Sequence, residues 1–391
     1  MYSFTLDSSI FNSLLKRIIL VSSSDPEALI SFLIEKNQLK IFYHSKLDKG
    51  LSTVLFYEEV PIISSTGDGL SSVYIHQFFS IKVPEFVSDN KYPQCKEVIF
   101  KFLDNILNIE YSIKWIKNLV PNKTTLNFPL LEKTADLEYY STLLNKEVDK
   151  RCVLGSDLAE GIAICNFIKS DVTSKDSNGI LLLSDGIKFS LVSTDSTIAI
   201  KWFCSLLPQE KGEQSDAFSM IVSNQTLTLI KNFVLDSESI VLEKHKQHVV
   251  VCVKARRMLI PIIKGSYLIE NIDEFFKVDS STFIGSVELK PLISAISTVS
   301  NNNKDIYKKV ELKFSSSGVD IKTDINSTLG VPVQVSKDVS LCINADYLLM
   351  AAQKLFTFGY TAQFFYDGES HRITFSSMED KLVFLIQGLS Y

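Results

Sequence analysis

The fold is decided by the stretch VSLCINADYLLMAAQKLF, which runs from Val339 to Phe356. Its first five residues are typical of a strand, and Asn344 then offers a side chain that favours the N-cap of a helix. From there apolar residues recur at three- and four-residue steps, the spacing of one face of a helix. That apolar stripe comprises Leu348, Leu349, Ala352, Leu355 and Phe356. The stretch therefore predicts a strand that leads directly into an amphipathic helix.

Three further strands are predicted after this helix. They are Tyr360–Tyr366, Arg372–Ser376 and Leu382–Gln387. The first two are separated by Asp367-Gly368, a dipeptide that favours a hairpin turn. The order strand, helix, three strands defines a β-α-β-β-β unit.

The same order occurs immediately upstream, so the last third of the chain contains two such units. Its elements are Thr282–Leu289, a helix over Lys290–Ser300, and strands at Lys308–Phe314, Val319–Thr323 and Thr328–Val335. Pro291 falls in the first turn of that helix, where its missing N–H costs nothing. One unit cannot bury its helix alone, whereas two joined units form a sheet with two helices on one face.

The plan repeats in the two preceding thirds. The middle third has predicted strands at Lys150–Leu154, Gly179–Ser184, Lys188–Thr194, Thr197–Phe203, Phe218–Val222, Ile240–Glu243, Val249–Lys254 and Met258–Ile262, with helices over 156–169 and 223–234. The first third fits less cleanly, with strands at Tyr2–Leu6, Ala28–Ile34, Leu39–Tyr43, Thr53–Glu59, Glu97–Leu103 and Ile106–Lys117, a helix over 8–21 and a short helix over 76–83. We therefore expect an α+β fold of three tandem domains, each of two units, over 1–146, 147–276 and 277–391, with linkers near Leu137–Lys146 and Phe275–Asp279.

Composition is ordinary for a soluble multidomain protein. The 391 residues are 46% hydrophobic and 22% charged, and the start of the chain lacks the basic and apolar regions of a signal peptide, so a cytoplasmic protein is expected. The six cysteines are scattered without a CxxC pair, which argues against a disulfide framework or a zinc site. The formal net charge of −5 argues against nucleic-acid binding unless the charges are unevenly distributed.

Motifs for catalysis are scarce. The sequence contains no GxxxxGK[ST] phosphate loop, no GxGxxG fingerprint, no HExxH and no GxSxG. His245 and His248 form an HxxH-like pair, but a solvated hairpin turn explains them better than a metal site does. This scarcity favours a binding protein without cofactor or metal. Two alternatives stay open: an enzyme whose catalytic residues are unrecognised, and a scaffold protein that uses the same repeat.

Several short segments are similar to the sequence motifs of one known protein family. Ile343-Asn-Ala-Asp-Tyr-Leu-Leu-Met350 is similar to the family's FNxxYLLD helix start, and Leu191-Val-Ser-Thr-Asp195 to its xVATDG strand end. Ile263-Lys-Gly-Ser-Tyr267 is similar to its LxDGxFPDY segment. Further similarity lies in Ile284–Ile296 and in the apolar end Val383–Leu389. The chain therefore resembles the bacterial-type DNA sliding clamp, which is the beta subunit of the replicative DNA polymerase III, and the resemblance covers all three thirds in the right order.

The resemblance implies a toroidal homodimer with helices inside and sheets outside. Such a ring encircles double-stranded DNA without sequence preference and tethers DNA polymerase during DNA replication as a non-catalytic processivity factor. A clamp loader is the implied further partner. Thr298 and Val299 match the position where the family packs against the neighbouring subunit, although ordinary packing at the helix end explains them equally well.

The charge distribution agrees with DNA inside a ring of helices. The six helix windows, 8–21, 76–83, 156–169, 223–234, 289–304 and 344–356, contain eight basic residues against three acidic ones, although the whole chain is acidic. The predicted DNA-binding residues are Lys16, Arg17, Lys82, Lys169, Lys231, Lys290, Lys304 and Lys354. Contacts from such residues to phosphates carry no sequence preference, which suits a sliding protein. A solvated helix face is the simpler alternative.

The resemblance also implies a hydrophobic cleft between the middle and last domains that binds a short partner peptide. By position it would include Leu154, Thr194, Ser196, Ile198, Leu268, Ile272, Leu385, Gln387, Gly388 and Leu389. The sequence departs from the family here. The chain ends Gln387-Gly-Leu-Ser-Tyr391 instead of Met-Pro-x-Arg-Leu, Ser196 replaces a glycine and Leu268 a proline. A divergent or phage-encoded clamp would show such departures, and its peptide preference would differ.

Overall fold

The structure is a computed structural model. It describes residues 1–22, 27–47, 52–84, 94–113, 122–131, 149–166, 168, 179–184, 188–195, 197–207, 218–234, 239–245, 248–262, 271–279, 282–300, 308–323, 327–331, 333–377 and 381–389.

The chain forms two compact units. Unit 1 comprises Met1–Ser156, Leu207–Ser215 and Thr228–Ile262, and unit 2 comprises Asp157–Leu206, Asp216–Leu227 and Ile263–Tyr391. Their boundary falls inside the predicted middle domain, because the strands of that region join two different sheets. The division into three domains stays a prediction.

Unit 1 contains two antiparallel sheets. The five-stranded sheet has the order β5 (Ser64–Thr66), β1 (Tyr2–Asp7), β7 (Glu97–Leu103), β8 (Ile106–Ile113) and β9 (Asn122–Pro129). The eight-stranded sheet has the order β10 (Asp149–Leu154), β15 (Ser239–Lys244), β16 (His248–Val253), β17 (Arg256–Pro261), β4 (Ser52–Val60), β3 (Gln38–Leu47), β2 (Leu29–Glu35) and β6 (Gly69–Tyr74). The pairing of β17 with β4 joins strands from distant parts of the sequence, as in Met258 opposite Phe56.

The core of unit 1 is rich in aromatic rings. Phe4 stacks on Phe100 with 4.5 Å between ring centroids, and Phe32 packs against both. Helix α1 (Ser8–Ser22) covers this cluster with the predicted apolar stripe, whose residues Phe11, Leu14, Leu15 and Ile18 are all buried. Stacked and edge-to-face rings stabilise a core beyond the area that they bury.

Unit 2 also contains two antiparallel sheets. The nine-stranded sheet has the order β14 (Phe218–Val222), β11 (Ile180–Ser184), β12 (Phe189–Thr194), β13 (Ile198–Cys204), β26 (Leu382–Gln387), β25 (Arg372–Ser377), β24 (Thr361–Asp367), β18 (Phe283–Glu288) and β22 (Val333–Val335). The four-stranded sheet has the order β21 (Ser327–Val331), β20 (Gly318–Lys322), β19 (Lys309–Ser315) and β23 (Val339–Asn344).

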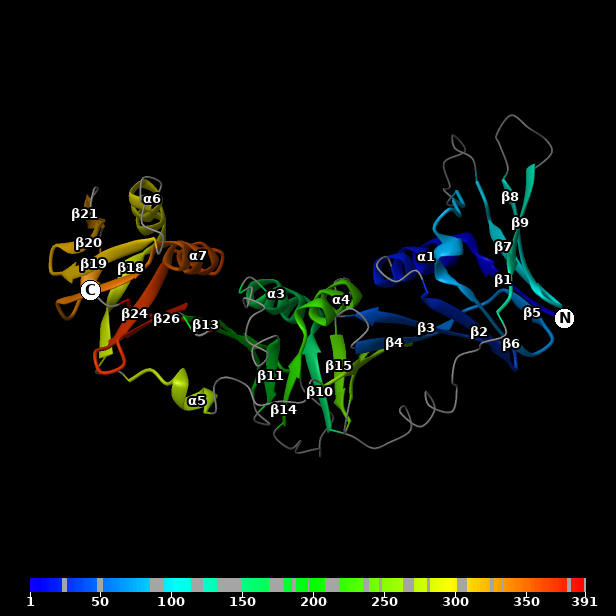
Figure 1. The fold of residues 1–391 in the computed structure, drawn as a ribbon, viewed down its shortest axis with the longest axis horizontal. Helices are drawn as coiled ribbons and strands as arrows, with labels where there is room; N and C mark the ends of the chain where they lie inside the picture. Colours follow the sequence, from blue (N-terminus) through cyan, green and yellow to red (C-terminus); the bar gives the residue numbers. More distant parts are fainter. Residues whose placement is uncertain are drawn as a thin grey trace. The chain divides into compact units, whose positions relative to one another are not determined.

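The helices follow the sequence pattern. Helices α6 (Leu289–Ser300) and α7 (Ala345–Phe356) lie side by side in unit 2 (Figure 1). Asn344 is the N-cap of α7, and its side chain accepts hydrogen bonds from the backbone N–H groups of Asp346 at 2.9 Å and Tyr347 at 3.1 Å. The strand and helix predicted from Val339–Phe356 are therefore confirmed. Helix α3 (Gly155–Cys165) also has its predicted place, and α4 (Asn224–Val234) begins in unit 2 and ends in unit 1.

Three predictions for the secondary structure were wrong. The helix over 76–83 is only the 3-10 turn η2 (Ile75–Phe78), because Pro84 disfavours helical backbone at the residue before it and Ile81 is β-branched. Strands β5, β6 and β9 were missed. The predicted strand Thr328–Val335 is two strands, because β21 pairs with β20 whereas β22 pairs with β18 in the other sheet.

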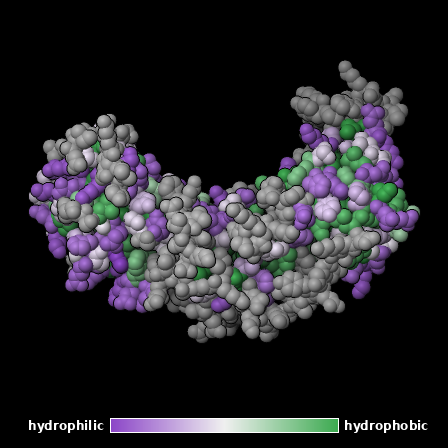
Figure 2. All heavy atoms as spheres, viewed as in Figure 1, coloured by the Kyte–Doolittle hydropathy of each residue, from purple (hydrophilic) through white to green (hydrophobic). Residues whose placement is uncertain are grey.

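The surface of the described residues is mixed. Figure 2 shows hydrophilic residues (purple) interspersed with hydrophobic ones (green) where unit 2 carries β18, β19 and β20. Among the described residues, no helix is long and apolar enough to span a membrane.

Candidate functional site

One face of the nine-stranded sheet in unit 2 carries a second apolar cluster, outside the core under the helices. Residues paired directly across neighbouring strands share a face, and the pairs Thr194–Ala199, Ala199–Leu385 and Lys201–Val383 define this one. We call it the α5 face, because it is covered by α5 (Ile272–Phe275), a single helical turn. In Figure 1, α5 lies on the side of the sheet away from α7.

Helix α5 is fixed by its cap and by its apolar side chains. The side chain of Asn271 accepts a hydrogen bond from the backbone N–H of Glu274 at 3.3 Å and donates to the Glu274 carboxylate at 2.8 Å. Ile272 and Phe276 are buried against Val192, Ala199, Val383 and Leu385, and Phe275 packs at the edge of the same cluster. The ring of Phe275 also lies 4.5 Å from the guanidinium of Arg372, a favourable cation–π distance.

The α5 face includes a buried cation, Lys201. Its side chain is only 7% exposed, and its Nζ lies 2.9 Å from a carboxylate oxygen of Asp273, which is itself 72% exposed. The same Nζ lies 5.0 Å from the centre of the Phe203 ring and 5.8 Å from that of Phe276. A buried ammonium needs such partners, because leaving it unpaired away from water is costly.

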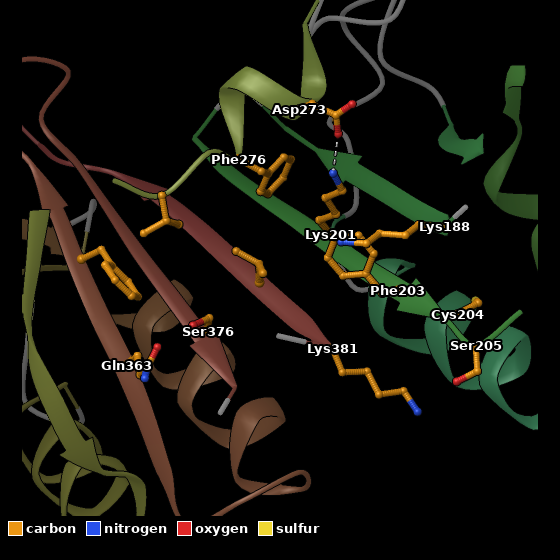
Figure 3. Close-up of a pocket in the computed structure, with 13 residues that line it drawn as sticks. Lys188, Lys201, Phe203, Cys204, Ser205, Asp273, Phe276, Gln363, Ser376 and Lys381 are labelled. Carbon is orange, nitrogen blue, oxygen red and sulfur yellow. Dashed lines mark hydrogen bonds and ion pairs between the residues drawn. The ribbon is translucent and has the colours of Figure 1, made fainter. Parts of the chain in front are cut away.

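A cavity of about 770 Å³ opens beside this ion pair (Figure 3). Its lining is partly apolar, from rings and aliphatic side chains, and partly cationic. The lining residues are Lys188, Lys201, Phe203, Cys204, Ser205, Asp273, Phe276, Val278, Gln363, Phe365, Ser376, Lys381 and Val383. Its size falls within the range of pockets that bind small molecules or peptide side chains.

Four of the residues predicted for the peptide cleft lie on or beside the α5 face. Thr194 and Leu385 point to it by strand register, Gln387 follows Leu385 by two residues, and Ile272 is part of α5. Gln387 is held by its Nε2 group, which donates to the carbonyl of Ser370 at 2.9 Å. These four residues therefore share one surface.

Strand register does not place the other predicted cleft residues on the α5 face. Ile198 pairs with Ile386 on the opposite face of the sheet, where it is buried, whereas Ala199 points to the α5 face. Leu154 ends β10 in unit 1. Gly388 donates its N–H to the carbonyl of His371 and Leu389 to that of Cys342, both at 2.7 Å. Ser196 and Leu268 lie outside the described residues.

Sequence reasoning missed the residues that give the α5 face its charge. Lys201 stands within the strand Ile198–Cys204, of which six of seven residues are buried. A lysine inside such an apolar run was the available signal, because lysine is almost never fully buried without a partner. Helix α5 gave no comparable signal, because one turn is too short to show helical periodicity.

Another polar network fixes α3 to the nine-stranded sheet in unit 2. Asp157, with 9% of its side chain exposed, accepts hydrogen bonds from Lys381 Nζ at 2.8 Å and from the backbone N–H of Ser205 at 2.9 Å. The indole N–H of Trp202 donates to the Asp157 carbonyl at 3.0 Å. Burial acts to raise the pKa of Asp157, but Lys381 and the Ser205 amide outweigh it and hold the pKa below its ordinary value.

The predicted DNA-binding residues differ in their surroundings. Lys16 on α1 and Lys290 on α6 are exposed, whereas Lys231 on α4 and Lys354 on α7 are half-buried. Lys82 is exposed but follows η2 without being on a helix, so its predicted helical position was wrong. Lys169 and Lys304 lie outside the described residues.

Arg17 is engaged within unit 1. Its guanidinium forms a two-point ion pair with the carboxylate of Glu58, at 2.5 and 3.2 Å, and donates to Ser13 Oγ at 2.6 Å. Burial raises the pKa of Glu58 although Arg17 and Arg256 lower it. The charge of Arg17 is thus largely neutralised by its neighbour, which weakens its candidacy as a phosphate contact.

The two predicted interface residues also differ from each other. Thr298 is exposed, and its hydroxyl donates to the carbonyl of Ser294 at 2.8 Å. Val299 is fully buried within a single chain. Val299 is therefore a core residue of unit 2, and an aspartate there would test folding instead of assembly.

Comparison with solved structures finds bacterial DNA sliding clamps that match the whole chain. The chain aligns with the DNA polymerase III subunit beta from Pseudomonas aeruginosa over 100% of both chains, at a TM-score of 0.74 and 13% identity. The DNA polymerase III beta subunit from Thermotoga maritima aligns over 100% of both chains, at a TM-score of 0.72 and 10% identity. The DNA polymerase sliding clamp from Bacillus subtilis aligns over 100% of this chain and 99% of its own, at 0.72 and 14%.

The fold is thus that of the sliding clamps, and the α+β fold predicted from the repeated order of strands and helices is confirmed. No family model and no curated protein matches the chain by sequence. Identities of 10 to 14% explain why the resemblance is carried by a few short segments.

Proposed function

We propose that this protein is a DNA sliding clamp, a processivity factor without catalytic activity that encircles duplex DNA. The observation that carries the proposal is the likeness to bacterial sliding clamps over the full length of the chain. Function does not follow from fold alone, so the proposal also draws on exposed basic residues of the helices and on the apolar α5 face.

The proposed ring is a homodimer of three-domain subunits, because closed two-fold assemblies are the commonest symmetric oligomers and the resemblance implies six domains in the ring. Thr298 is the residue that we expect at the contact between subunits. Thr298→Arg should shift the protein from twice the mass of one chain to a monomer, measured by light scattering. Thr357→Arg, at the exposed end of α7, is a matched control. A Thr298→Arg protein that stays dimeric would place the interface elsewhere.

DNA contact is proposed for Lys16 and Lys290, the exposed basic residues among those described on α1 and α6. Contacts between lysines and phosphates release counterions, so binding weakens with salt by a log–log slope of about 0.9 per contact. Replacement of both lysines by alanine should flatten that slope. The matched control replaces Lys313 and Lys337, which are equally exposed but lie on β19 and in the turn before β23.

The decisive experiment measures retention on circular and linear DNA of the same sequence. A closed ring loaded with a clamp loader stays on a circle after a salt wash and slides off a linear molecule. Equal retention on both would refute encirclement, and retention on neither would refute DNA binding.

Partner binding is proposed for the surface formed by Thr194, Leu385, Gln387 and Ile272, with DNA polymerase and the clamp loader as the expected partners. Removal of the last four residues, from Gly388, should weaken binding of a polymerase peptide at least tenfold, or ~1.4 kcal/mol. Gln387→Ala, which changes the surface and keeps the chain end, is the companion variant. Full affinity in both variants would mean that partners dock elsewhere.

A further inference from the structure

We propose that the cavity beside α5 is a separate binding site for an acidic and aromatic segment of a partner protein. The inference deepens the proposed function, because the partner would be a protein tethered by the clamp. The cavity lies on the same face as the predicted peptide cleft, but none of its lining residues belongs to the predicted cleft. Binding to it can be measured without DNA, so the two proposals can fail independently.

The first support is a buried cation whose carboxylate partner is exposed. Lys201 is already removed from water by its surroundings, and Asp273 reaches it from the rim with most of its side chain in solvent. An incoming carboxylate would meet an ammonium that is already desolvated and oriented, so little further ordering is needed. The displaced Asp273 carboxylate would be solvated by water, so its replacement on Lys201 by a partner's carboxylate would require little free energy.

The second support is the positive charge of the cavity lining, to which Lys188 contributes beside the Phe203 ring. The ammonium group of Lys188 lies 5.6 Å from the centre of the Phe203 ring. The ammonium group of Lys201 lies over the same ring (Figure 3). Lys381 lines the cavity as well, although its ammonium is paired with Asp157. The lining thus carries three cations and one carboxylate in a chain whose net charge is −5. Charge complementarity therefore selects an anionic occupant.

The third support is that α5 shows which chemistry this face accepts. Asp273 places a carboxylate on Lys201, while Phe275 and Phe276, two and three residues later, pack against the apolar cluster. A partner segment with the same order of acidic and aromatic residues could direct a carboxylate to Lys188 and Lys201. Its ring could contact the apolar wall of Phe365 and Val383.

The size of the cavity argues for side chains and against a nucleic acid. A volume of about 770 Å³ accommodates a few residues of a peptide. Nucleic-acid binding needs a basic groove that follows the backbone over several nucleotides. Asp273 at the rim would also repel successive phosphates.

The test uses a fluorescein-labelled peptide with the core Asp-Glu-Phe-Phe between glycines, and fluorescence anisotropy with the full chain. Two matched peptides, with Asn-Gln-Phe-Phe and Asp-Glu-Ala-Ala cores, remove the charges or the rings. We expect the first peptide to bind at least about tenfold more tightly than either, because both kinds of contact contribute. An unlabelled oligothymidylate serves as competitor.

Variants of the protein should change affinity in opposite directions. Lys188→Glu should weaken peptide binding about fivefold or more, whereas Asp273→Asn should strengthen it about threefold, because it removes the internal competitor. The controls are Lys313→Glu, an equal charge change on β19, and Glu288→Gln, which neutralises an exposed carboxylate at the end of β18. Lys201→Met should abolish the preference for the charged peptide.

Each outcome decides the proposal. Opposite shifts in Lys188→Glu and Asp273→Asn, with both controls unchanged, would support it. Equal affinity in all variants, no difference among the three peptides, or displacement by oligothymidylate would overturn it. Retention on circular DNA is expected to be unchanged in Lys188→Glu, so loss of peptide binding alone would leave the proposed clamp function intact.

Discussion

The Asp157 network allows a quantitative test of how α3 is held on its sheet. Asp157→Ala removes the acceptor for Lys381 and for the Ser205 amide. Hydrogen bonds to a charged group contribute about 1.5–3 kcal/mol each. Lys381 is 29% exposed and Ser205 is exposed, so water replaces part of what is lost. We therefore expect the free energy of unfolding to fall by about 2–3 kcal/mol.

Urea unfolding provides the assay. The chain has two tryptophans, and Trp115→Phe leaves Trp202, which contacts the network, as the only tryptophan to report by fluorescence. With an m-value of about 2–3 kcal/mol/M, the midpoint of Asp157→Ala should fall by about 1 M. Asp338→Ala, at an exposed aspartate of the same unit, is the control. A midpoint for Asp157→Ala within error of this control would refute the network as a source of stability.

Acid should reduce the effect of the same substitution. Because the folded pKa of Asp157 lies below its ordinary value of 3.8, its stabilising contribution is fully present above that value. The contribution is lost as the pH falls through the folded pKa. The difference in the free energy of unfolding between the unsubstituted protein and Asp157→Ala should accordingly be constant near neutral pH and shrink below pH 3.8. A difference that is independent of pH would contradict the assignment.

Three other substitutions test separate features. Gly161→Ala would put a methyl group in steric overlap with the Trp202 ring, so overpacking of about 1–3 kcal/mol should exceed the gain in helix propensity and lower the urea midpoint. Gly388→Ala would put a methyl group 2.7 Å from the carbonyl of His371, and the thermal midpoint should fall by about 2–4 °C per kcal/mol of strain, measured by circular dichroism. The pKa of Glu58 is higher in the folded protein than its ordinary value of 4.5. Ionisation of Glu58 therefore lowers the free energy of unfolding as the pH rises from 4.5 through the folded pKa. Glu58→Gln should lack this decline in urea titrations between pH 4.5 and 7, and an identical decline would assign it to other groups.

Most of the fold could be predicted where strands and helices show a clear period. The middle and last thirds follow the predicted order because their strands are long apolar runs and their helices carry regular stripes. Strands β5 and β6 were missed because the segment Ser64–Tyr74 is rich in serine and glycine, which is typical of loops. The pairing of β5 with β1 and of β6 with β2 overrides this local preference for a loop, since strand formation depends strongly on the neighbouring strands.

The candidate site was predicted in part. Alternation along Leu382–Gln387 indicated which residues of the last strand could face a cleft, and Leu385 does share a surface with Thr194. The register between β13 and β26 was not available from the sequence, and a shift by one residue exchanges Ile198 for Ala199 on that surface. The ion pair between Lys201 and Asp273 spans 72 residues, a separation that no local pattern reveals.

The place of β26 in its sheet has a consequence for how the protein is made. This strand follows all the other strands of the nine-stranded sheet in the sequence, yet it lies in the interior of that sheet, between β13 and β25. Until it emerges, the edge of β13, with Ala199 and Trp202, has no neighbour to pair with. Unpaired apolar edges promote association between chains, and pairing across such a long sequence separation is slow. Ribosome-bound chains that lack β26 should therefore depend on chaperones, and this dependence should fall abruptly when β26 leaves the ribosome and completes the sheet.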